Sequence, residues 1–127
     1  MTYKGLVAIV VDEIPTMRKI IRGMLKDLKF QEVFEVQNGS VALELLEINK
    51  VDLIISDWNM STMNGLDLLQ RVRSNKLLEE IPFLMAFDAP KKEEILQAID
   101  AKVSNIIVKP FSPAVLAEKL AAIIPKR

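Results

Sequence analysis

The chain of 127 residues is half hydrophobic and 27% charged, a length and composition that suit one folded domain with a substantial buried core. Its 17 Lys and Arg balance its 17 Asp and Glu, so the net charge gives no indication of binding to nucleic acid or to an anionic membrane. Because the sequence has no Cys and no His, thiolate and histidine chemistry are excluded, and any reaction must use carboxylates, lysine, hydroxyls, backbone groups or a hard cation.

Short apolar runs alternate with stretches of helical periodicity along the chain. The runs predict strands over residues 6–11, 33–36, 53–57, 81–86 and 106–108. Apolar residues at helical spacing predict helices over residues 14–28, 41–48, 66–72, 90–99 and 112–124. This strict alternation indicates an α/β fold with a doubly wound, five-stranded parallel sheet. Helices on both faces of the sheet would make a three-layer α/β/α sandwich.

The fourth helix carries two further expectations. Asp88 is predicted to be its N-cap, with Pro90 in the first turn. The apolar residues Ile95, Leu96 and Ile99 are predicted to form its buried stripe.

No segment has the features of a targeting signal or a membrane span. The apolar run over residues 6–11 is too short for a signal-peptide core and is followed by acidic residues. No apolar stretch approaches the length of a transmembrane helix, and no repeat or linker divides the chain. We therefore expect a cytoplasmic protein with a single domain over residues 1–127.

Charged residues follow three of the five predicted strands. Asp12 and Glu13 come after the first strand, Asp57 ends the third, and Lys109 comes after the fifth, while Phe87 follows the fourth. Parallel strands deliver their last residues to the same edge of the sheet, and that edge is where open α/β sheets bind ligands. The topology therefore predicts three carboxylates and one lysine side by side.

Three neighbouring carboxylates repel one another and favour a bound cation. A set of oxygen ligands without His or Cys is typical of a Mg²⁺ site. The backbone carbonyl of Asn59 could be the last ligand that the protein supplies. Lys109 would add a point charge for phosphate oxygens, and Asp57 would act as a carboxylate nucleophile that forms an aspartyl phosphate. The competing interpretation is that Lys109 only neutralises a structural acid cluster and that Asp57 only ends a strand.

Four motifs stand at the spacing of a known family. They are Asp12-Glu13, Asp57-Trp58-Asn59-Met60, Gly65 and Val108-Lys109-Pro110-Phe111. On these residues the chain resembles the receiver domain of two-component signalling, and among receivers it is similar to chemotaxis response regulators of the CheY type along nearly its whole length.

The resemblance implies a flavodoxin-like fold with strand order 2-1-3-4-5. It also implies that Asp57 is the phosphoacceptor, that Lys109 contacts the phosphoryl group, and that a histidine kinase is the donor. By the same resemblance, Asp12 and Glu13 bind Mg²⁺, together with Asp57 and Asn59. Such a protein is a regulatory phosphoacceptor rather than an enzyme, with at most self-catalysed phosphotransfer and dephosphorylation.

The sequence departs from the family at five positions. Phe87 stands where the family has Ser or Thr, and Ile106 stands where it has a switching aromatic residue. The other three departures are Ser61 in place of a usual Pro, and Lys102 and Asn105 in place of small residues. Since Phe87 and Ile106 occupy the switch positions, we expect phosphorylation to change the output surface only weakly.

The leading hypothesis is a stand-alone, monomeric receiver with no output domain that signals by contact with another protein. Its expected target surface surrounds the last strand and is bordered by Lys91, Lys92, Ile95, Ile106 and Lys119. The alternatives are a divergent receiver that acts as a phosphorylation-independent interaction module, and a phosphate sink that drains a kinase.

Overall fold

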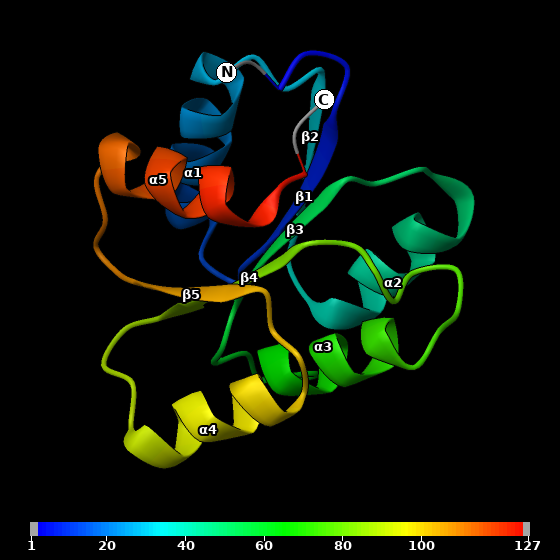
Figure 1. Cartoon of the computed structure of the whole chain (residues 1–127), viewed down its shortest axis with the longest axis vertical. Helices are drawn as coiled ribbons and strands as arrows, with labels where there is room; N and C mark the ends of the chain where they lie inside the picture. The colour runs from blue at the N-terminus through cyan, green and yellow to red at the C-terminus, as the bar shows by residue number, and fades with distance from the viewer. Residues whose placement is uncertain (1–2, 126–127) are drawn as a thin grey trace.

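Five parallel strands form one sheet in the order β2-β1-β3-β4-β5 in the computed structural model, which describes residues 3–125 (Figure 1). The strands are β1 (Val7–Val11), β2 (Glu32–Val36), β3 (Leu53–Asp57), β4 (Phe83–Phe87) and β5 (Asn105–Val108). This order confirms the predicted doubly wound fold, with a switch point between β1 and β3 where the chain direction across the sheet reverses.

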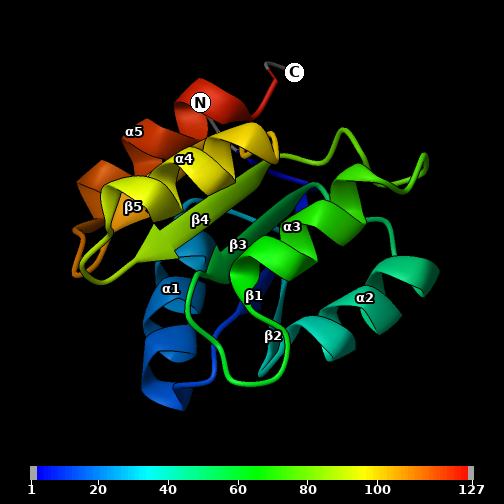
Figure 2. The same cartoon turned by 90° about the horizontal axis from the view of Figure 1, so that it is seen from below.

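Five helices in the described region cover the two faces of the sheet. They are α1 (Pro15–Asp27), α2 (Gly39–Ile48), α3 (Gly65–Arg73), α4 (Lys92–Asp100) and α5 (Pro113–Ile123). α1 and α5 lie on one face of the sheet, and α2, α3 and α4 lie on the other (Figures 1 and 2). Each set of helices shares one hydrophobic cluster with the sheet. The predicted three-layer sandwich is therefore confirmed.

Burial along the strands explains why the sequence shows apolar runs. Every residue of β3 and β4 is buried, because helices cover both sides of these central strands. The edge strands β2 and β5 are only partly buried, and each carries one exposed residue, Glu32 in β2 and Val108 in β5. Several helices begin where the sequence offers a cap: Asn38, Asn64 and Ser112 each accept a hydrogen bond from a backbone N–H in the first turn.

The predicted start of α4 is wrong, and its predicted buried stripe is wrong for Leu96 and Ile99, while Ile95 is half-buried. The helix begins at Lys92 rather than near Asp88, and its N-cap is Lys91. Its inner face packs on the sheet through the small residue Ala98, so Leu96 and Ile99 lie on the flanks with 50% and 56% of their surface exposed. Their helical spacing resembled a buried stripe, but the face that packs against the sheet is turned away from them.

The remaining differences are shifts at the ends of elements. β4 begins two residues later than predicted, and Ile81 and Pro82 precede it. None of the helices in the described part of the chain is long and apolar enough to span a membrane.

Candidate functional site

The carboxyl edge of the sheet brings together three buried charged residues from separate strands. Asp12 follows β1, Asp57 ends β3 and Lys109 follows β5. Their exposed fractions are 2%, 6% and 6%, although charged side chains are almost never buried without partners. Of the four charged residues predicted to lie together, the structure brings Asp12, Asp57 and Lys109 into contact and leaves Glu13 outside this group.

The ammonium group of Lys109 lies between the carboxylates. Its Nζ is 3.1 Å from Asp57 Oδ1, 3.4 Å from Asp12 Oδ2 and 3.9 Å from Asp88 Oδ1. Burial alone would lower the pKa of Lys109, but the neighbouring carboxylates, Asp57 foremost, hold that pKa above its ordinary value. Lys109 is therefore a fixed positive charge at neutral pH.

Asp57 is the less satisfied of the two buried acids. Its Oδ1 is near Lys109 Nζ, but it has no hydrogen-bond partner of good geometry in the described structure. Burial raises the pKa of Asp57, the Lys109 ammonium opposes the increase, and Asp12 and Asp88 add to it. An underpartnered buried oxygen is what a carboxylate that receives a ligand or a phosphoryl group requires.

Asp12 is held in place by the start of α1. Its Oδ1 accepts a hydrogen bond from the Ile14 N–H at 2.9 Å, which leaves Oδ2 facing Lys109. Arg18 Nη1 donates to the Asp12 carbonyl at 2.6 Å, and the same guanidinium lies 3.7 Å from Glu35 Oε1. The first turn of α1 thus fixes the direction in which the Asp12 carboxylate points.

Glu13, the other acid predicted for the metal, is exposed and accepts a hydrogen bond from the Ser61 hydroxyl. This bond lowers the pKa of Glu13. No three acidic side chains within residues 3–125 converge as a ready-made metal site. A cation would therefore be held first by the carboxylates of Asp12 and Asp57.

Trp58 and Phe87 form an aromatic wall beside Asp57. Their rings stack with centroids 4.9 Å apart, and Phe87 is buried where the sequence analysis noted a lost hydroxyl. A pocket of about 330 Å³ opens against this wall, lined by Asp57, Trp58, Asn59, Phe87, Asp88, Ala89, Lys91 and Glu94. The pocket thus joins the carboxylate to the start of α4.

Gly65 allows the loop after β3 to close tightly. A Cβ atom at this position would lie 2.4 Å from the Asp57 carbonyl oxygen and 2.6 Å from Met85 Sδ. Because such distances are not tolerated, only glycine lets α3 begin this close to the site.

The predicted target surface is more apolar than the sequence analysis expected. Lys91 and Lys92 are exposed, whereas Ile95, Ile106 and Lys119 are half-buried. Four apolar side chains on the same elements or their neighbours are also exposed, and the sequence analysis did not assign them to this surface: Leu96, Ile99, Val108 and Val115. Val108 follows the buried Ile107 on the edge strand β5, and because successive side chains of a strand point to opposite faces, this neighbour was the signal that could have found it.

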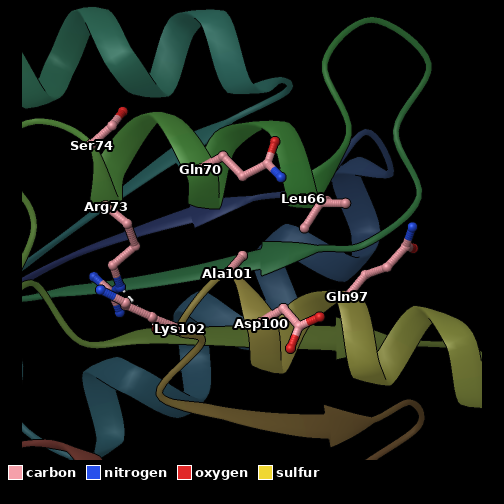
Figure 3. Close-up of a pocket in the computed structure, with 8 residues that line it drawn as sticks. All are labelled: Leu66, Gln70, Arg73, Ser74, Gln97, Asp100, Ala101 and Lys102. Carbon is pink, nitrogen blue, oxygen red and sulfur yellow. Dashed lines mark hydrogen bonds between the residues drawn. The ribbon is translucent and has the colours of Figure 1, made fainter.

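A separate groove of about 500 Å³ runs between α3 and α4 and contains none of the predicted site residues (Figure 3). One of the residues that line it is Arg73 at the end of α3, to which no sequence pattern pointed. Its guanidinium donates to the carbonyls of Lys102, Glu79 and Ile81 and to the Ser104 hydroxyl, at 2.7 to 3.2 Å. Arg73 therefore joins the end of α3 to the turns before β4 and β5.

The fold and the buried acid–lysine group define a class of α/β regulatory domain, and sequence comparison gives the same class. The profile of the response regulator receiver domain family matches residues 8–121. The chain therefore belongs to the response regulator receiver family, which is a regulatory family rather than a class of enzymes. Receiver domains generally use Mg²⁺, in agreement with the acidic residues around Asp12 and Asp57.

Among characterised proteins, this chain is similar to chemotaxis proteins. It is 44% identical over 117 residues to Chemotaxis protein CheY1 of Helicobacter pylori, covering 91% of this chain and 94% of that protein. It is 39% identical over 123 residues to Chemotaxis protein CheY-3 of Vibrio cholerae, covering 97% and 95%. The crystal structure of chemotaxis protein CheY4 of Vibrio cholerae superposes with a TM-score of 0.88 at 27% identity, covering 94% and 98%. The protein is thus a CheY-like receiver domain.

Proposed function

We propose that this receiver domain accepts a phosphoryl group on Asp57 and signals in a chemotaxis-type pathway. The observation that carries the proposal is the Lys109 ammonium, buried between the carboxylates of Asp12 and Asp57 at the ligand-binding edge of the sheet. Asp57 Oδ1 contacts the Lys109 ammonium but has no other partner in the described structure, which supports a role as phosphoacceptor.

In the proposed reaction, Asp57 is the nucleophile. A carboxylate oxygen of Asp57 attacks phosphorus, the bond from phosphorus to the donor nitrogen of a histidine kinase breaks, and that nitrogen keeps the electron pair. Lys109 stabilises charge on the phosphoryl oxygens, and Asp12 and Asp57 would hold the cation, with Glu13 and the Asn59 carbonyl as the remaining candidate ligands. Bound Mg²⁺ would neutralise charge on the transferred group. Hydrolysis of the acyl phosphate would use the same groups.

The partners of this protein follow from its family and surface. CheY-like receivers generally interact with histidine kinases and with downstream targets. For this chain we propose a target surface on α4, β5 and α5 that includes Lys91, Lys92, Ile95, Ile106 and Lys119. The exposed apolar side chains beside these residues support a protein partner.

We also propose that the protein acts as a cytoplasmic monomer. The support is its similarity, over nearly its whole length, to chemotaxis proteins. The chemotaxis relatives also favour a signalling receiver over a phosphorylation-independent module or a phosphate sink.

Phosphorylation is tested by incubating the protein with Mg²⁺ and acetyl phosphate and measuring its intact mass. We expect one added phosphoryl group on the wild type and none on Asp57→Asn. The control is Asp67→Asn, which removes an exposed acid from α3 and should leave the reaction unchanged. Equal phosphorylation of wild type and Asp57→Asn would refute the assignment.

Metal binding is tested separately by calorimetry, with the emission of the single tryptophan, Trp58, as a second readout. We expect a dissociation constant in the millimolar to sub-millimolar range, because few carboxylates bind the ion and several waters remain. Identical Mg²⁺ titrations of wild type and Asp57→Asn would count against this site.

The consequence of the lost switch residues is tested on the target. Phe87 cannot donate a hydrogen bond to a phosphoryl oxygen, and Ile106 has no polar tip to move between buried and exposed positions. We expect the affinity for a target peptide to change by less than about fivefold between free protein and protein that carries a phosphoryl mimic with Mg²⁺. A tenfold change would show that coupling is strong despite both substitutions.

A further inference from the structure

One carboxylate joins the phosphoacceptor pocket to the first turn of α4. Glu94 Oε2 accepts a hydrogen bond from the indole Nε1–H of Trp58 at 3.2 Å. Its other oxygen, Oε1, accepts the backbone N–H of Lys91 at 3.0 Å. Both bonds therefore depend on one side chain, which lies on the wall of the pocket that Asp57 also lines.

The Trp58 end of this bridge is fixed directly after the phosphoacceptor. The Trp58 backbone N–H donates to the Ala86 carbonyl, and its own carbonyl accepts the Gly65 N–H, each at 2.9 Å. The indole is held on its face by the stacked Phe87 ring and at its edge by Glu94. A change at Asp57 that moves this segment must therefore strain or break the bond to Glu94.

The α4 end depends on the same residue because the usual cap is missing. The N-cap residue is Lys91, whose side chain has no acceptor, and Asp88 lies outside the helix. Glu94, the third residue of α4, instead satisfies the Lys91 N–H from within the first turn. Without this carboxylate, that N–H loses its partner and the first turn loses a constraint.

We propose that Glu94 is a positioning residue that couples the phosphoacceptor pocket to the start of α4. The proposal rests on the proposed role of Asp57. It supplies a connection that does not pass through Ile106, although the Phe87 ring stacks on the Trp58 indole. Because coupling between two sites is reciprocal, loss of Glu94 should have two effects. It should change how firmly the Trp58 indole is held, and it should change how the first turn of α4 responds when the pocket is occupied. The expected effect lies in the first turn of α4, next to Lys91 and Lys92 of the proposed target surface. Its size, about threefold, agrees with the weak change in target affinity expected above.

The test compares wild type with Glu94→Ala and Glu94→Gln, and Glu93→Ala is the matched control. Glu93 is its acidic neighbour in the same turn; it is exposed and makes no hydrogen bond or ion pair in the described structure. The first readout is quenching of Trp58 fluorescence by acrylamide, which needs no phosphorylation. We expect the quenching constant to rise by roughly half or more in Glu94→Ala, because the indole N–H loses its partner, and to stay unchanged in Glu93→Ala.

The second readout is hydrogen exchange of the amides at the start of α4, with and without beryllofluoride and Mg²⁺ as a phosphoryl mimic. In the wild type we expect the mimic to change exchange of these amides by about threefold or more. The change should disappear in Glu94→Ala and persist in Glu93→Ala. Glu94→Gln, whose single carbonyl oxygen can keep only one of the two bonds, should be intermediate and guards against misfolding of the alanine variant.

Two results would overturn the coupling: an unresponsive α4 in wild type that binds the mimic, or a full response in Glu94→Ala. If the wild type fails to bind the mimic at all, the proposed role of Asp57 fails. The quenching experiment then decides the positioning role alone, and equal quenching of wild type and Glu94→Ala overturns it.

Discussion

Replacement of Lys109 by Met tests whether the buried charges form one interdependent group. The Lys109 side chain is 3% exposed, and the side chains of its partners Asp12 and Asp57 are 2% and 7% exposed. Met keeps most of the volume of the lysine stem but removes the ammonium, so two buried carboxylates face each other without a cation. Removal of one partner from a buried ion pair typically destabilises a protein by about 3–5 kcal/mol.

We therefore expect Lys109→Met to lower the free energy of unfolding by about 3–5 kcal/mol at pH 7 without Mg²⁺, a large part of the 5–15 kcal/mol typical of a domain. With a urea m-value of about 2 kcal/mol/M, the midpoint should fall by roughly 2 M. Urea unfolding followed by far-UV circular dichroism measures this difference. Lys92→Met, which changes an exposed lysine, should stay within about 0.5 kcal/mol of wild type.

The double variant Asp57→Asn/Lys109→Met separates charge from packing. If the penalty is uncompensated charge, neutralising Asp57 should restore at least about 1 kcal/mol to Lys109→Met, although each change alone perturbs the site. A Lys109→Met protein within about 1 kcal/mol of wild type, or a double variant no more stable than Lys109→Met, would refute this reasoning.

Three further variants probe separate features of the fold. The raised pKa of Asp57 means that the folded protein holds a proton there more tightly than the unfolded chain, so ionised Asp57 opposes folding. Asp57→Asn should therefore have a higher free energy of unfolding than wild type at pH 7. Urea unfolding at several pH values should show this difference disappear below pH 3.8, the ordinary pKa of aspartate. A difference that grows in acid would contradict the raised pKa of Asp57. Gly65→Ala should destabilise by about 1–3 kcal/mol in thermal unfolding, since its Cβ meets the Asp57 carbonyl, and a neutral result would mean that the loop shifts freely. Arg73→Ala should lower the free energy of urea unfolding by about 2–3 kcal/mol, because three carbonyls lose their hydrogen bonds to the guanidinium. Replacing the exposed Arg71 by Ala should change it little. Equal effects of the two substitutions would contradict a stabilising role of the Arg73 hydrogen bonds.

The sequence by itself determined the fold and the centre of the site. Apolar runs in β3 and β4 are continuous because both faces of a central parallel strand are covered, and this pattern is local enough to read from the chain. Once the strands are parallel, Asp12, Asp57 and Lys109 must arrive at one edge. Their convergence therefore follows from strand ends and topology and requires no knowledge of packing.

Tertiary structure alone decided which side chains meet beyond that edge. Leu96 and Ile99 have the spacing of a buried stripe, but the rotation of α4 about its axis, set by Ala98 against the sheet, leaves them exposed. Glu13 bonds to Ser61 at 48 residues' separation, and Glu94 bonds to Trp58 at 36. Such contacts depend on helix rotation, loop path and rotamer, which are fixed jointly by residues far apart in the chain. No local pattern in the sequence encodes them.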